Sequence, residues 1–104
     1  MDNNMEKKMA VWLKMRGFAE TVEQGEEFVR SAQNNETNKE LTAVLSKNPD
    51  AALNMGGKVT DENAIKFLRE KLATGQRLIG FWEENPKDTN AIFFAREMAK
   101  IDNA

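Results

Sequence analysis

One segment, residues 60–84, limits the fold of this chain more than any other, because its apolar side chains keep a helical repeat throughout. One row of residues, spaced three or four apart, contains Ile65, Leu68, Leu72, Gly75, Ile79 and Trp82. A second row beside it contains Phe67, Lys71, Thr74, Leu78 and Phe81. Such spacing places each row on one side of a helix.

The glycine inside this segment allows two interpretations. Gly75 either breaks the segment into a hairpin of two helices or lies within one long helix that bends there. We favour one helix, because the apolar row keeps its phase across the glycine. Thr60 can cap its N-terminus, and Asp61 and Glu62 complement the helix dipole in the first turn.

Other helices are predicted from shorter apolar repeats and from capping residues. We expect them over residues 4–16, 21–34, 37–48 and 86–101, with a short extra helix opened by Asn48-Pro49-Asp50. Thr21 with Gln24, and Thr37 with Glu40, have capping-box spacing. Asn85-Pro86 repeats the cap-plus-proline arrangement of Asn48-Pro49, and no stretch shows the alternation typical of strands. The prediction is an all-α fold of about five helices, six with the short one, ending in a C-terminal helical hairpin.

Composition supports one ordered domain over residues 1–104. Leu, Ile, Val and Phe contribute 22 of 104 residues, and six methionines supplement this small apolar supply. The net charge is −2, so self-repulsion is small and a lean core is sufficient. Without cysteine, a basic signal-peptide region or an apolar run of about 18 residues, the expected location is the cytoplasm and no membrane span is expected.

The missing residue types argue against catalysis. The chain has no His, Cys or Tyr, which removes the usual proton shuttle, thiolate nucleophile and phenolic acid. Zinc sites built on His or Cys are impossible. In the segment NMGGKVT, Val59 stands where a phosphate loop needs Ser or Thr. We therefore expect no enzyme activity, no cofactor and no metal site.

Aromatic residues gather near the predicted C-terminal hairpin. Phe81, Trp82, Phe93 and Phe94 are four of the eight aromatics. Adjacent helix residues point about 100° apart, so either several helices cover both members of each pair or one member is exposed. Trp12 lies in a first helix whose lysines make it basic and amphipathic. These five aromatics are the candidate protein-interface residues.

Basic residues suggest an alternative function. Residues 58–82 carry a net charge of +2, and their cations could follow a phosphate backbone. The candidate nucleic-acid contacts are Lys58, Lys66, Arg69, Lys71 and Arg77. A helix-turn-helix reader is disfavoured, because its second helix would present bulky apolar residues and glutamates to the bases.

The leading hypothesis is a non-catalytic protein-interaction module that acts as an inhibitor, adaptor or assembly factor. The hypothesis rests on the absence of the usual catalytic residue types. It rests also on the number of aromatics near helix ends, which exceeds what a single packed face of a helix requires. The partner is expected to be another protein, with self-association as a second form of the same hypothesis. Small helical proteins of this kind are common among phage and mobile-element accessory factors. A small nucleic-acid-binding regulator is the alternative.

Overall fold

The long helix α5 runs the length of the molecule, and the other helices lie against it. The computed structural model describes residues 3–102, within which there are six helices and no strand. The helices are α1 (Asn3–Met15), α2 (Val22–Gln33), α3 (Lys39–Ser46), α4 (Pro49–Asn54), α5 (Asp61–Glu84) and α6 (Thr89–Asp102). The all-α prediction is confirmed, and α4 is the short extra helix.

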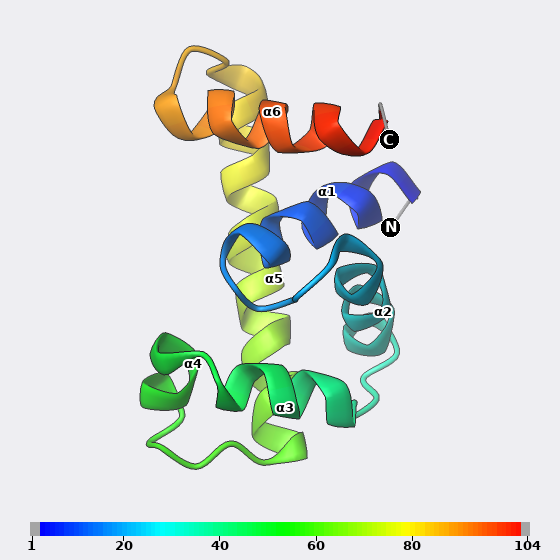
Figure 1. Ribbon diagram of the computed structural model, residues 1–104, viewed down its shortest axis with the longest axis vertical. Coiled ribbons are helices and arrows are strands. Elements are labelled where there is room, and N and C mark those ends of the chain that lie inside the picture. Colours follow the sequence, from blue (N-terminus) through cyan, green and yellow to red (C-terminus); the bar gives the residue numbers. More distant parts are fainter. Residues whose placement is uncertain (1–2, 103–104) are drawn as a thin grey trace.

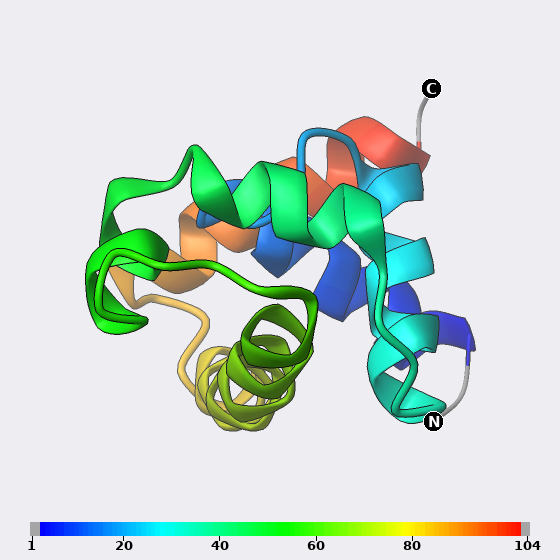
Figure 2. The ribbon, with the colours of Figure 1, turned by 90° about the horizontal axis from the view of Figure 1, so that it is seen from below.

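Three helices cross α5 at successive levels. Figure 1 shows α3 near its N-terminal end, α1 near its middle and α6 at its C-terminal end. Figure 2 looks nearly along α5 and shows all three on the same side of it, so the opposite side of α5 faces solvent. Helix α2 packs against α1 and also reaches α5.

Helix α5 is continuous through Gly75, as predicted. A Cβ atom at this position would lie 2.6 Å from Cε3 of Trp12, closer than real Cβ contacts allow. Gly75 is therefore the place where the indole of α1 reaches the backbone of α5. The missing side chain permits close packing of two crossing helices and does not interrupt either of them.

The caps largely follow the sequence prediction. The N–H of Gln24 donates to Oγ1 of Thr21 at 3.0 Å, and the N–H of Asn63 donates to Oγ1 of Thr60 at 3.1 Å. The N–H of Ala51 donates to Oδ1 of Asn48 at 3.0 Å. Each bond satisfies one N–H that a helix leaves free in its first turn.

Two predicted caps are wrong. Helix α3 is capped by Asn38 and not by Thr37, because Oδ1 of Asn38 accepts the N–H groups of Glu40 and Leu41. Helix α6 begins at Thr89, and Oδ1 of Asp88 accepts the N–H of Asn90 at 2.9 Å.

Asn85 has a different role from the one predicted. It closes α5, where its side-chain Nδ2 donates to the carbonyl of Phe81 at 2.9 Å. The Asn-Pro pair therefore belongs to a helix exit, and the next helix starts with its own cap. An asparagine satisfies a free carbonyl as readily as a free N–H, which is why its type alone did not distinguish these ends.

Helix α1 occupies the centre of the core. Five successive residues, from Met9 to Leu13, are buried. A helix can bury residues on all its faces only when neighbours surround it, and α1 contacts α2, α5 and α6. The largest fully buried side chains include Phe18, Phe28 and Leu68 from the surrounding elements, and the buried apolar side chains form one cluster.

The C-terminal pair forms the predicted helical hairpin, in which α6 lies across the end of α5 (Figure 1). The rings of Trp82 and Phe94 pack together, with centroids 5.3 Å apart. This contact anchors α6 to α5, and further contacts attach α6 to α1.

Candidate interaction surface between α1 and α6

The five aromatic candidates divide into buried and exposed residues. Trp12, Trp82 and Phe94 are 3%, 8% and 6% exposed, so their side chains belong to the core and are not available at a surface. Phe81 and Phe93 are 51% and 50% exposed. Each adjacent pair therefore keeps one ring in the core and presents the other to solvent, which is the second of the two arrangements that helix geometry allowed.

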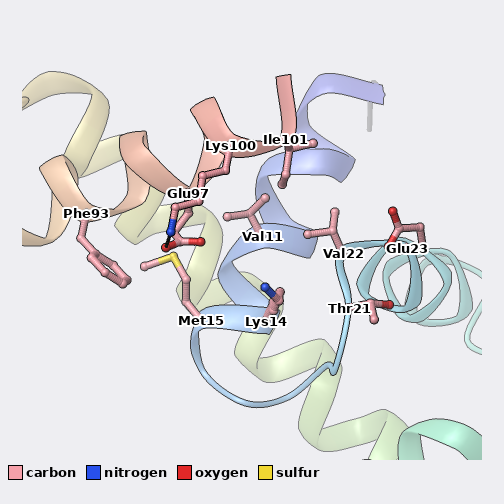
Figure 3. A pocket seen from close by; sticks show the side chains of 10 residues that line it. All are labelled: Val11, Lys14, Met15, Thr21, Val22, Glu23, Phe93, Glu97, Lys100 and Ile101. Carbon is pink, nitrogen blue, oxygen red and sulfur yellow. Dashed lines mark hydrogen bonds and ion pairs between the residues drawn. The ribbon is translucent and has the colours of Figure 1, made fainter. Parts of the chain in front are cut away.

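Phe93 lies at a groove of about 600 Å³ between α1, α6 and the start of α2. Figure 3 shows its ring on the α6 side of the groove, beside Met15 of α1. The remaining apolar lining comes from Val11, Val22 and Ile101. The groove thus brings α6 together with two neighbouring segments near the start of the chain, and half of its lining side chains are apolar.

Charged side chains form the rim of this groove. On α6, Nζ of Lys100 lies 3.1 Å from Oε1 of Glu97, so these two charges compensate each other (Figure 3). Lys14 of α1 and Glu23 of α2 also line the groove. Neither forms an ion pair within residues 3–102.

Phe81 belongs to a different part of the surface. It lines a separate hollow at the α5–α6 turn, together with Pro86 and Lys87. Leu78, one turn earlier on α5, is 37% exposed. No ring contact joins Phe81 to Phe93 among the described residues, so the two exposed rings serve separate surfaces.

The candidate nucleic-acid residues are spread over several environments. Lys66, Arg69 and Arg77 are exposed on α5, and Lys58 is exposed in the preceding loop. A guanidinium N–H of Arg69 donates to Oδ1 of Asn35 at 3.0 Å. The ammonium of Lys71 lies 5.4 Å from the centroid of the Phe67 ring. The structure therefore does not bring all five cations onto one face.

Residues 3–102 contain no group of three or more acidic, His or Cys side chains placed to hold a metal ion. None of the helices within that range has the length and apolar character to cross a membrane.

Most of the groove lining was missed from the sequence. Met15 and Ile101 could be placed on apolar helix faces, but no local pattern tells which helix end meets which. Leu53 was also missed; it is 80% exposed on α4, away from the aromatic candidates. A sequence shows the apolar side of each helix, whereas a groove depends on how the helices cross.

Comparison with models of protein families, with curated protein sequences and with solved structures found no match in any of the three.

Proposed function

We propose that this chain is a non-catalytic protein-interaction module, and that it binds its partner through the α1–α6 groove. An inhibitor, an adaptor and an assembly factor all use such a surface, and each is a form of this proposal. The half-exposed ring of Phe93 at an apolar groove carries the argument. Large aromatic side chains in partly enclosed sites are the usual anchors of protein interfaces.

The energetic argument is direct. Full burial of a Phe side chain contributes about 1.5–3 kcal/mol, and about half of this remains available at Phe93 in the free chain. Val22, Met15 and Ile101 add apolar surface on the neighbouring helices. A partner that covers the groove therefore gains apolar contact area that folding has left unused.

Affinity purification from the native host tests the proposal, with Phe93→Ala compared against Phe81→Ala. The two phenylalanines are equally exposed, but only the first lines the groove. We expect one protein to co-purify with the unaltered chain and with Phe81→Ala, and to be lost with Phe93→Ala. Equal capture by all three would refute the assignment of the groove. Light scattering of the purified chain reports whether the captured protein is a second copy.

A nucleic-acid-binding regulator is the second candidate. Its support is that Lys66 and Arg77 are exposed on one face of α5, about three helical turns apart, and form no ion pair within residues 3–102. Glu62 and Glu70 lie on the same face, each four residues from Lys66, and weaken its positive field. Fluorescence anisotropy with mixed DNA and RNA probes at low salt tests this candidate. Binding that weakens steeply with salt would support it, and no binding at low salt would remove it.

A further inference from the structure

The solvent side of α5 carries charges in a regular order. Figure 2 shows α1, α3 and α6 on one side of this helix, so its other side is open. With about 100° of rotation per residue, Lys66, Glu70, Arg77 and Glu84 lie within about 40° of one another on the open side. All four are exposed, and none of them forms an ion pair within residues 3–102. We call these four residues the outer row of α5.

The signs of the outer row alternate, so the row complements a reversed copy of itself. In an antiparallel copy, Lys66 lies opposite Glu84, and Glu70 lies opposite Arg77. The midpoints of these two pairings both fall near Thr74, about 2 Å apart along the helix axis, a difference that long side chains span. A parallel copy in register would instead place like charges together, which disfavours that orientation.

The other side chains on this face are compatible with an antiparallel copy. Ala73 lies near the midpoint and is exposed, and its short side chain allows the two helices to approach closely. Phe81, which is 51% exposed, would meet the aliphatic stem of Lys66 from the other copy. Arg69 lies toward the edge of the face, where it donates to Oδ1 of Asn35 at 3.0 Å.

We propose that two copies of this chain associate through the open sides of α5, antiparallel and related by a two-fold axis. The same surface then serves both copies, and each charge pair occurs twice. A contact between two single helices is small, so the dimer is weak and depends on protein concentration. The α1–α6 groove has no lining residue from α5. The inference is therefore separate from the proposed function, and the dimer leaves both grooves open.

Sedimentation equilibrium of the full chain tests the association. We expect the mass to rise toward two copies with concentration, and the dimer to weaken as salt screens its charge pairs. Arg77→Glu and Glu70→Arg should each weaken it about tenfold, because each sets like charges opposite one another at two places. Lys47→Glu makes the same charge change as Arg77→Glu at an exposed position outside α5 and should have little effect.

Mixing the two weakened variants is the sharpest test of the pairing. In the mixture, one chain carries two acids at positions 70 and 77 and the other carries two bases. Opposite charges therefore face each other again at both places. We expect the mixture to associate at least as tightly as the unaltered chain, although each variant alone does so poorly. A misfolded variant would not be rescued in this way, and circular dichroism checks the fold of each.

Cross-linking tests the orientation. The chain has no cysteine, so Ala73→Cys and Glu84→Cys each introduce a single thiol. An antiparallel dimer brings the two 73 positions together and holds the two 84 positions about 30 Å apart. Under mild oxidation, we expect linked dimers to form much faster with Ala73→Cys. Equal rates for the two variants would overturn the antiparallel arrangement.

Three further results would overturn the inference. The first is a chain that stays monomeric at every concentration. The second is a mixture of Arg77→Glu and Glu70→Arg that does not associate. The third is a dimer that Phe93→Ala abolishes and Arg77→Glu leaves unchanged, since the second copy would then occupy the groove. The host capture experiment depends on Phe93 and not on the outer row, so it judges the proposed function independently.

Discussion

Helices α1 and α6 both cross α5 and both place an aromatic side chain in the core, yet they differ in how completely they are covered. Helix α1 packs against α2, α5 and α6, and its residues from Met9 to Leu13 are buried. Within α6, Ala91 and Phe94 are buried, whereas Ile92 and Phe93 are 40% and 50% exposed. The two helices are similarly apolar. The difference in burial therefore comes from position: α1 crosses the middle of α5, whereas α6 crosses its end. The middle helix α1 is covered by α2, α5 and α6, while the terminal helix α6 packs mainly against α5 and α1 and leaves more of its apolar side chains exposed.

The largest test of this comparison removes the aromatic anchor of each helix. Trp12→Ala should lower the free energy of unfolding by about 4–5 kcal/mol, and Phe94→Ala by about 3 kcal/mol. The cost at Phe94 is expected to be smaller because a helix at the end of the molecule can shift to fill the cavity. Urea unfolding followed by circular dichroism measures both values. A loss at Phe94 equal to or above that at Trp12 would contradict the comparison.

The contact between α1 and α5 can be tested without removing any apolar group. Gly75→Ala places a methyl group 2.6 Å from the Trp12 ring and should destabilise the fold by about 1–3 kcal/mol through overpacking. Gly80 is the matched control, because a Cβ there meets no atom within 4 Å. Gly80→Ala should stabilise the protein by about 0.5–1 kcal/mol through helix propensity. Thermal unfolding of the two variants should shift the melting temperature in opposite directions.

Hydrogen exchange compares the two helices in the unaltered protein. Helix α6 should open locally without the rest of the core, because its packing against α5 and α1 is confined to one side. Its slowest amides should exchange at least about tenfold faster than those of α1, a difference of about 1.4 kcal/mol. Mass spectrometry of deuterated fragments resolves this difference. Equal protection of both helices would show that they unfold as one unit.

The smallest expected effects concern the outer surfaces of the same region. Nζ of Lys8 in α1 lies 2.9 Å from Oε2 of Glu83 near the end of α5. Glu83→Gln should cost about 0.5 kcal/mol or less, because the glutamate is half exposed and solvent screens the pair. Phe93→Ala should cost about 1 kcal/mol or less, because half of the ring is already covered and the higher helix propensity of alanine offsets part of that loss; the fold then remains intact for binding measurements. Denaturant titration checks both, and a larger loss at Phe93 would place its ring in the core.

Local sequence features predicted most of the helices but not their assembly. The phased row from Ile65 to Trp82 predicted α5, including its continuity through Gly75, because a helical repeat is a property of consecutive residues. The choice between Thr37 and Asn38 as a cap depended on the exact first turn of α3, and both residue types suit that position. Helix periodicity alone therefore left the helix starts uncertain by one to three residues.

The candidate site was less predictable, for a physical reason. The sequence showed that Phe93 and Phe94 point in different directions, but which ring faces the core depends on where α5 and α1 lie relative to α6. Likewise, Met15 and Ile101 each belong to a local apolar face, and the groove exists only where the two helices cross. Such tertiary relations join residues separated by most of the chain and leave no local pattern.

The surrounded position of α1 has a consequence for synthesis of the chain. Helix α1 leaves the ribosome before the helices that cover it: it buries its residues from Met9 to Leu13 against α2, α5 and α6, and α5 does not begin until Asp61. Helix α2 can cover one side of α1 early, but the sides that face α5 and α6 stay uncovered until those helices have been made, and contacts between distant residues form slowly. We expect the nascent chain to expose α1 to chaperones until α5 has emerged, and folding to be completed as a late, concerted step.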